Sequence, residues 1–304
     1  MDDFSDELTT IQLQQVKEDF EDRLDSWSIK TFGENSKPRR THLGISEIGD
    51  PCRRKLWYGF RWMTPKGSND GRIERLYQFG HDSEHRYVRY LRATGWTVIQ
   101  YANQDEIDAS SFDPTVASSV VPKQISVTGI MGHYGGSTDG VGISPLFPNV
   151  KFVLEMKTHN TKSFTHYISH GLQKSKPKHW DQMCSYGWKQ DIKYGLYFPE
   201  NKNDSDIKVT AVKLDFNRAM ELEKKAESII LSQEAPEGVS KNPAYFDCTY
   251  CSARPVCHYG QVPPKNCRSC KNSKPTENAT WTCSKFGVIP SEFIQKGCDQ
   301  WQPM

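Results

Sequence analysis

The 304-residue sequence predicts an α/β fold, in which a mixed α+β sheet is flanked by helices. Two observations support this prediction. Apolar residues repeat with a helical period in some segments and crowd into short β-rich runs in others. Their order along the chain is a long helix, at least three strands, a second helix and two further strands. The composition, 36% hydrophobic and 25% charged, is globular, and the length allows one large domain or two small ones.

The charge balance, the absence of a long apolar run and the start of the chain argue against a polycationic, a membrane-spanning or a secreted protein. With 39 basic and 37 acidic residues the net charge is 39 minus 37, or +2, so contacts with nucleic acid would come from local patches. No apolar run approaches the ~18 residues that a membrane span needs. The opening MDDFSDELTT is acidic and resembles neither a signal peptide nor a transit peptide. We therefore expect an intracellular, cytoplasmic protein, where disulfides are disfavoured.

The first part of the chain predicts two helices joined by a linker. Residues 1–30 carry apolar side chains at spacings of mostly three and four, which indicates an amphipathic helix. Residues 31–40 are rich in turn formers and are typical of a linker. In the segment 43–62, Ser46 can cap a helix and Cys52 precedes a basic and aromatic run. The basic residues of that run contact a DNA backbone or form a solvated helix face: Arg53, Arg54 and Lys55.

The middle of the chain holds the predicted sheet. Helices are expected over 72–94, around 182–186 and over 216–231. Strands are expected over 96–101, within 124–143, and over 151–156, 194–198 and 207–214. Residues 105–121 are polar and irregular, as in a loop. His133 is expected to pack or form hydrogen bonds rather than bind metal, and Cys184 is expected to be a small buried residue.

The stretch from Gly135 to Lys157 indicates a divalent-metal site. Asp139 lies at a glycine-rich strand end, and the next strand carries Glu155 and Lys157. Residues two apart on a strand point to the same face, so Glu155 and Lys157 lie side by side. Hard cations such as Mg2+ bind carboxylate oxygens, make a bound water nucleophilic and stabilise charge on a phosphoryl group. The alternative is a solvated hairpin without catalytic function.

This D-G…E-x-K pattern resembles motifs II and III of the PD-(D/E)XK nuclease superfamily, with Thr138 where proline is usual. The G-H-D-S-E-H run, with Gly80 four residues before Glu84, resembles motif I of the RecB-like branch. Q-x3-Y resembles its motif IV. The resemblance implies a restriction-endonuclease-like core with an α-βββ-α-β order, here extended by at least one candidate strand.

The same resemblance implies a role for each motif residue. Mg2+ or Mn2+ would be held by three carboxylates and one main-chain carbonyl, with one histidine as an alternative ligand: Glu84, Asp139, Glu155, Met156 and His85. Lys157 would orient water or stabilise the charge of the pentacovalent phosphorus. Gln182 and Tyr186 are one helical turn apart on one face, where they would position DNA beside the metal.

Seven of the nine cysteines lie between residues 248 and 298, a clustering that indicates metal ligands. Cys248, Cys251 and Cys257 form a C-x2-C-x5-C pattern that lacks a fourth ligand, for which Cys52 is the candidate. One early cysteine with a late C-x2-C-x5-C resembles the iron–sulfur nucleases, among them AddB-type helicase-nucleases and CRISPR-associated adaptation nucleases. That resemblance implies a 4Fe–4S cluster, and zinc is the alternative for the same thiolates.

The last four cysteines predict a separate module over residues 261–304. One C-x2-C knuckle and two single cysteines can form a four-thiolate zinc site, the alternative being unrelated free thiols: Cys267, Cys270, Cys283 and Cys298. The tail has little apolar content, so a metal would be needed to fold it. Four basic residues of the module would be available to phosphates: Arg268, Lys271, Lys274 and Lys285.

Together these features predict three parts: an N-terminal helix and linker (1–40), an iron–sulfur nuclease core (41–260) and the zinc module (261–304). The resemblance implies a phage-type, metal-dependent DNA exonuclease in DNA processing, recombination or replication, in the host cytoplasm if phage-encoded. DNA would be its substrate, replication or recombination proteins possible partners, and six basic residues its DNA contacts: Arg53, Arg54, Lys55, Lys174, Lys176 and Lys178. The alternative is a catalytically inactive nucleic-acid-binding protein with structural metal centres.

Overall fold

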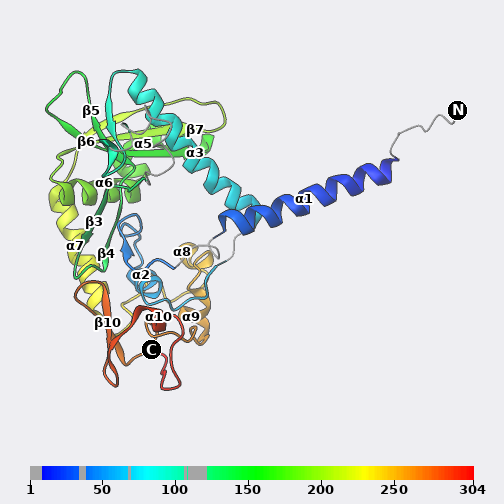
Figure 1. Ribbon diagram of the computed structural model, residues 1–304, viewed down its shortest axis with the longest axis vertical. Helices are drawn as coiled ribbons and strands as arrows, with labels where there is room; N and C mark the ends of the chain where they lie inside the picture. Colours follow the sequence, from blue (N-terminus) through cyan, green and yellow to red (C-terminus); the bar gives the residue numbers. More distant parts are fainter. Residues whose placement is uncertain (1–8, 34–38, 68–69, 106–107, 109–121) are drawn as a thin grey trace. The chain divides into compact units, whose positions relative to one another are not determined.

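The computed structural model describes residues 9–33, 39–67, 70–105, 108 and 122–304. The chain divides into two compact units, one of residues 1–39 with 66–83 and one of residues 40–65 with 84–304. Helix α3 (Gly71–Ala93) contributes to both (Figure 1). No helix among the described residues combines the length and apolar character that crossing a membrane requires.

The first unit is built on helix α1 (Thr10–Phe32). Thr9 and Gln12 form a capping box at its start, which satisfies two main-chain N–H groups that a helix leaves open. Near its end, Arg75 from the first half of α3 lies 2.6 Å from Asp25 Oδ1 and 3.1 Å from Ser28 Oγ. These contacts hold the two helical segments together within this unit. A helix was predicted over residues 1–30; α1 forms from Thr10 onward, and most of its large apolar side chains are exposed rather than packed.

The second unit contains the predicted mixed sheet. Its five strands run in the order β2 (Thr97–Ile99), β5 (Gly140–Ile143), β6 (Lys151–His159), β7 (Tyr194–Asn201) and β8 (Thr210–Lys213). Only the central pair, β6 and β7, is parallel; the other three pairs are antiparallel. Helices cover both faces, so the predicted α/β fold with a mixed, helix-flanked sheet is confirmed.

The two faces of the sheet have different partners because successive residues of β6 point to opposite sides. Leu154 and Met156 pack with Tyr87, Val88 and other apolar residues from the second half of α3. The opposite face, which carries Glu155, is covered by α5 (Thr161–Ser175) and α6 (Pro177–Gln190). Helix α7 (Phe216–Leu231) packs on α6, so this side has two helical layers.

A smaller sheet adjoins this core. It consists of β1 (Leu43–Gly44), β4 (Tyr134–Ser137) and β3 (Ser126–Gly129). Gly132, at φ +81°, lies in the tight connection between β3 and β4, where left-handed backbone favours glycine. Helix α2 (Arg53–Phe60) buries its aromatic face in the same core. Of the predicted loop 105–121, all but residues 105 and 108 lie outside the described residues.

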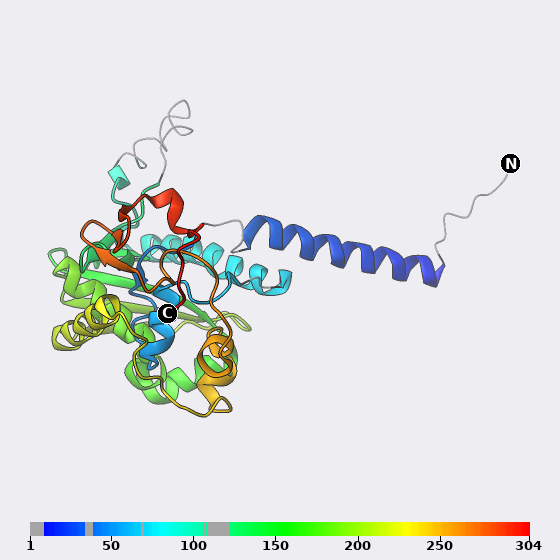
Figure 2. The same ribbon diagram turned by 90° about the horizontal axis from the view of Figure 1, so that it is seen from below.

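The C-terminal part belongs to the same compact unit as the large sheet. It holds the short helices α8 (Phe246–Thr249), α9 (Arg254–Tyr259) and α10 (Ser291–Ile294) and an antiparallel sheet of β9 (Ser273–Thr276), β10 (Thr280–Cys283) and β11 (Gly287–Ile289). Both views place this segment beside α2 (Figures 1 and 2). His133 forms hydrogen bonds with the carbonyls of Thr276 and Thr280, as its predicted packing role requires.

One residue anchors the tail to the core. Arg268, between two of the tail cysteines, is 1% exposed, and its guanidinium stacks 4.6 Å from the ring centre of Phe60, 4.5 Å from Trp62 and 4.6 Å from Trp281. Arg61, also buried, donates a 3.0 Å hydrogen bond to the Ser273 carbonyl. The expectation that Arg268 is available to phosphates is therefore wrong, because its charge is enclosed by aromatic rings.

Candidate active site and cysteine clusters

Three predicted residues meet where β5 begins beside β6. The β5–β6 pairing starts at Gly140 opposite Leu154, and further along β6 the Met156 N–H donates to Asp139 Oδ2 at 2.9 Å instead of to a strand. Lys157 Nζ lies 3.3 Å from Asp139 Oδ2 and 2.8 Å from Glu155 Oε1. Because Asp139 precedes the paired part of β5, its side chain rather than a main chain occupies this edge of β6. The structure thus places two acids around one ammonium group.

Burial gives this cluster unusual electrostatics. Glu155 is 0% exposed, and burial raises its pKa to about 8 despite the opposing effect of Lys157. Burial alone would lower the pKa of Lys157, but Asp139 and Glu155 outweigh it and raise that pKa above its ordinary value. Lys157 therefore stays charged and acts as the counter-ion of the two carboxylates.

A third carboxylate, Glu84, belongs to the same electrostatic cluster. Burial, and then the charge of Asp139, raises the pKa of Glu84 to about 7. Glu84 lies in the middle of α3, so a helix delivers this acid to the site that two strands build. His85, the next residue, is exposed. Its proposed role as an alternative ligand stays a prediction.

Helix α6 adds the two residues of the predicted fourth motif. Gln182 Nε2 donates a 2.9 Å hydrogen bond to Glu155 Oε2, and both groups are buried. Tyr186 Oη donates to the Ser137 carbonyl at 2.6 Å, two residues before Asp139. Gln182 therefore fixes one acid directly, and Tyr186 fixes the chain that carries the other.

The donor set suits a hard divalent cation. Glu155 Oε1 is buried, and the Lys157 ammonium lies 2.8 Å from it. A buried carboxylate oxygen that faces a cation among two further acids is an environment that also suits Mg2+ or Mn2+. Among the described residues no three His, Cys, Asp or Glu side chains already stand as a set of metal ligands. The ammonium of Lys157 occupies the centre between two of the acids.

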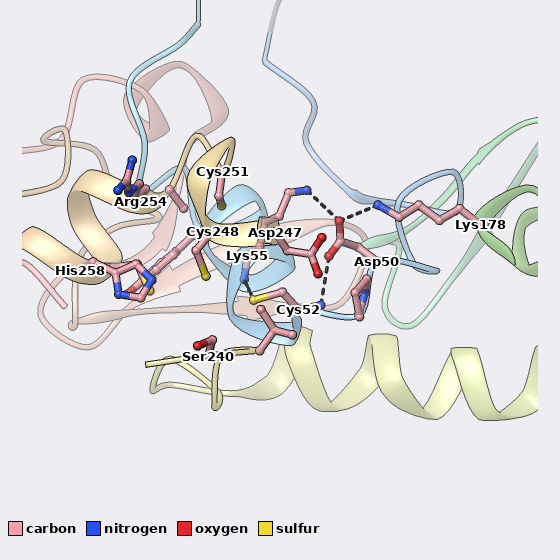
Figure 3. A pocket seen from close by; sticks show the side chains of 16 residues that line it. Asp50, Cys52, Lys55, Lys178, Ser240, Asp247, Cys248, Cys251, Arg254 and His258 are labelled. Atoms are coloured by element: carbon pink, nitrogen blue, oxygen red, sulfur yellow. Dashed lines mark hydrogen bonds and ion pairs between the residues drawn. The ribbon is translucent and has the colours of Figure 1, made fainter. Parts of the chain in front are cut away.

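The first cysteine set lines one cavity of about 250 Å3: Cys52, Cys248, Cys251 and Cys257. Cys52 caps α2, and its sulfur accepts the Lys55 N–H at 3.4 Å. The Arg54 guanidinium lies 3.8 Å from the Cys257 sulfur. Figure 3 shows side chains from α2 and α8 facing this space. Sequence positions about 200 apart thus converge, and their soft thiolates fit an iron–sulfur cluster or zinc.

The predicted DNA contacts are largely engaged within the protein. Lys55 Nζ and Lys178 Nζ lie 2.7 Å and 2.8 Å from Asp50 Oδ2, one on each side of this carboxylate (Figure 3). Arg54 also donates to the Pro236 carbonyl at 2.7 Å. Two further predicted DNA contacts also have partners within the protein: Arg53 donates to Ser228, and Lys176 donates to Ser163. The last one, Lys174, is exposed.

The second cysteine set lines a separate cavity of about 480 Å3: Cys267, Cys270, Cys283 and Cys298. Burial, and then the neighbouring Cys298, Cys270 and Cys283, raise the pKa of Cys267 to about 11. The Gln302 N–H points at the Cys270 sulfur, 3.5 Å away. Four cysteines that share one space and disfavour each other's thiolate forms suit a cation, which would stabilise those thiolates.

Sequence reasoning missed a cluster of three polar side chains beside the acids, of which His159 and Tyr197 are buried and His179 is half-buried. His159, His179 and Tyr197 form hydrogen bonds with one another on the sheet face that carries Glu155. Two signals were available: His159 follows Lys157 by two on the same strand, and His179 precedes Gln182 by three on the same helix. The third partner, Tyr197, depends on strand register, which local sequence does not specify.

No protein-family model and no curated protein matches the chain. Among solved structures it is similar to an alkaline exonuclease, LHK-Exo, from Laribacter hongkongensis, at 18% identity over 63% of this chain and 87% of that one, with a TM-score of 0.41. The complex of LHK-Exo with dAMP is similar at 19% identity, with the same coverages and a TM-score of 0.43. SSO0001 is similar at 14% identity over 78% of this chain and 96% of that one, with a TM-score of 0.37. These likenesses are distant.

Proposed function

We propose that the protein is a metal-dependent deoxyribonuclease that hydrolyses phosphodiester bonds from a DNA end. One observation carries the proposal: Asp139, Glu155 and Lys157 converge at a strand edge, where a buried amide holds Glu155. Two acids beside a lysine that is held charged form an arrangement suited to phosphoryl chemistry. A role in DNA processing, recombination or replication is part of the same proposal.

The residues of the site would have two different roles in hydrolysis, metal binding and orientation of the water or phosphate. Asp139, Glu155 and Glu84, with the Met156 carbonyl, would hold Mg2+ or Mn2+, which lowers the pKa of water and neutralises phosphate charge when bound. Lys157 would orient the attacking water or donate to a non-bridging oxygen of the phosphorus. The water oxygen would form the new P–O bond, the bond to the leaving deoxyribose oxygen would break, and the water's proton would pass to solvent or to the leaving oxygen.

The two cysteine sets are proposed as structural metal centres. Cys52 with Cys248, Cys251 and Cys257 would bind a 4Fe–4S cluster, which joins α2 to residues near the end of α8 and α9. Support comes from the shared cavity, the soft ligands and the N–H and guanidinium groups near two of the sulfurs. The last four cysteines would bind zinc in their own cavity. Zinc in both cavities is the competing assignment, and metal analysis of anaerobically purified protein separates the two.

The test of nuclease activity uses matched DNA substrates and matched variants. Purified protein is incubated with end-labelled linear DNA, single- and double-stranded, and with a covalently closed circle, in Mg2+, Mn2+ or EDTA. We expect cleavage of the linear substrates, none of the circle and none in EDTA. Glu155→Gln should abolish cleavage, whereas Glu227→Gln, the same change on the exposed face of α7, should leave it intact.

If the protein is instead an inactive nucleic-acid-binding protein, the same assay should show no cleavage. This alternative predicts DNA binding in gel shifts with no cleavage by the wild type in either metal. Cleavage of the closed circle would instead keep the nuclease and remove its dependence on an end. Wild-type-like cleavage by Glu155→Gln would remove the proposed site.

A further inference from the structure

A second row of polar side chains extends the proposed active site along the sheet. On β6, Glu155, Lys157 and His159 alternate onto one face. In the neighbouring strand β7, Tyr197 is in register with Glu155, so its ring stands beside that acid. On α6, His179 lies one turn before Gln182. The same strand and helix that position the acids therefore bring two histidines and a tyrosine together.

These groups form one chain of hydrogen bonds, which we call the relay: Lys176, Ser163, His159, Tyr197 and His179. Tyr197 Oη lies 2.7 Å from His159 Nε2 and 2.9 Å from His179 Nδ1. The two imidazoles are stacked, with ring centres 5.8 Å apart and an interplanar angle of 23°. At the far end Ser163 Oγ lies 3.3 Å from His159 Nδ1 and accepts from Lys176 Nζ.

The direction of the first hydrogen bond is fixed, because an ammonium group only donates and Ser163 Oγ therefore accepts from Lys176. We assign the remaining directions so that each hydrogen bond holds one proton, with the Ser163 hydroxyl donating to His159 Nδ1. In this assignment His159 carries its proton on Nε2 and donates to Tyr197 Oη. The single phenolic proton is left for His179 Nδ1. His179 therefore carries its own proton on Nε2, at the open end of the relay.

Burial keeps these groups neutral. Desolvation, and then nearby lysines, lower the pKa of His159 to about 4 and that of His179 to about 3. Burial also raises the pKa of Tyr197, so the phenol keeps its proton at neutral pH. His179 thus presents a neutral N–H, with its orientation and tautomer fixed by the relay behind it.

The Nε2–H of His179 has no acceptor within the described part of the chain, although the other ring nitrogen is bonded. The fully buried polar atoms without a partner do not include this nitrogen, as expected for an atom that solvent or a ligand can reach. His179 lies close enough to Lys157 for the lysine charge to act on it. An uncommitted donor beside the cation of the site points to an anionic oxygen as its partner.

We propose that His179 binds a non-bridging phosphate oxygen of the nucleic-acid backbone through its neutral Nε2–H, with the rest of the relay as positioning residues. This inference rests on the proposed nuclease function, because the ligand is taken to be the DNA bound at Glu155 and Lys157. A neutral donor holds the phosphate without adding positive charge next to Lys157. The relay would thereby fix the backbone at a set distance from the acids.

The first test reads the relay itself and is independent of any activity. Nitrogen-15 correlation spectra of selectively labelled histidine distinguish protonated from bare ring nitrogens. We expect His159 and His179 to be neutral Nε2–H tautomers at pH 7. Tyr197→Phe removes the donor to His179 Nδ1 and should leave His179 as a tautomer mixture. A doubly protonated His179, or the Nδ1–H tautomer, overturns the inference.

The second test measures DNA affinity at several salt concentrations in the non-cleaving Glu155→Gln protein. His179→Phe should weaken binding about tenfold, because a hydrogen bond to a charged group is lost. The slope of log affinity against log salt should not change, whereas loss of a cationic contact lowers it by about 1. His179→Gln, which keeps an N–H donor, should recover part of the affinity. His170→Phe, an exposed histidine on α5, is the matched control and should have no effect.

The outcomes separate this inference from the proposed function. Unchanged affinity of a folded His179→Phe protein removes the phosphate contact and leaves the nuclease standing. A reduced salt slope makes His179 a cation and removes the neutral-donor inference. If the wild type neither cleaves nor binds DNA, the nuclease fails and the phosphate contact with it, while the tautomers are still decided by the spectra. If only His179→Phe unfolds, His179→Ala, which also lacks the donor, takes its place in the affinity comparison, and unchanged affinity of that protein overturns the phosphate contact.

Discussion

Gln182 and Glu155 are joined by a 2.9 Å hydrogen bond inside the protein, with both side chains shielded from solvent. The amide donates to one carboxylate oxygen and leaves the other, Oε1, facing the ammonium of Lys157 at 2.8 Å. A helix residue thus sets which oxygen of a strand residue faces the cation of the site.

Gln182→Ala should therefore slow cleavage more than it weakens metal binding. Loss of the amide frees the Glu155 side chain, and a catalytic group that is displaced slightly can cost roughly a hundredfold in rate. Single-turnover cleavage at saturating Mn2+ measures the rate, and calorimetric titration measures metal affinity. Gln190→Ala, at the end of the same helix, serves as the control. An equal loss of rate and affinity would make Gln182 a metal-site residue rather than a positioning residue.

Metal affinity should rise steeply with pH. The pKa of Glu84 is raised to about 7 and that of Glu155 to about 8, so protons compete with the metal below these values. As pH rises from about 6 to 8 the carboxylates lose these protons, and affinity should increase up to tenfold per pH unit for each proton released. Calorimetry with Mn2+ in buffers of different ionisation enthalpy counts the protons. A pH-independent affinity over this range contradicts the prediction.

Stability should fall on mild acidification because of His159, which is buried, and His179, which is half-buried. Their folded-state pKa values, about 4 for His159 and about 3 for His179, lie below the ordinary value of about 6.5. Between about pH 6.5 and pH 4 these two histidines are protonated in the unfolded chain but neutral in the folded chain. The stability present above pH 6.5 is therefore lost as pH falls toward 4. Urea unfolding at a series of pH values should show this slope. His179→Gln should reduce it, because one of the two uptake sites is gone.

Substitutions in the two cysteine sets should release different metals, and a substitution in either set should destabilise the fold. Cys52→Ala is expected to lose iron, and Cys283→Ala to lose zinc, each measured by elemental analysis of anaerobically purified protein. Because Arg268 is enclosed by aromatic rings of the core, disorder in the tail should also lower the unfolding temperature of the whole unit. Cys184→Ala, a buried cysteine outside both sets, should leave both metal contents unchanged. Two zinc ions and no iron would make both centres zinc sites.

The sequence predicted local elements and the closeness of Glu155 and Lys157, because both depend on short spacings. The helix expected over 216–231 is α7 itself, and the E-x-K spacing on one strand places Glu155 and Lys157 together. Contacts between distant parts of the chain could not be predicted from the sequence. A run of basic residues does not show that Lys55 and Lys178 both pair with Asp50, which lies 128 positions before Lys178. The relay was missed for the same reason, since Tyr197 joins it only through the register of β6 and β7.

The way α2 is packed has a consequence for biosynthesis. Arg61, at the end of α2, donates to carbonyls of residues that follow it by 171 to 212 positions. At roughly 5–20 residues per second, a ribosome would complete those partners about 10–40 s after α2 emerges. During that interval Trp57 and Phe60 lack the surfaces that bury them, so the nascent chain exposes an aromatic helix. Ribosome-bound chains stalled before residue 268 should therefore bind chaperones, and competence to cut DNA should arise only once the tail has closed over α2.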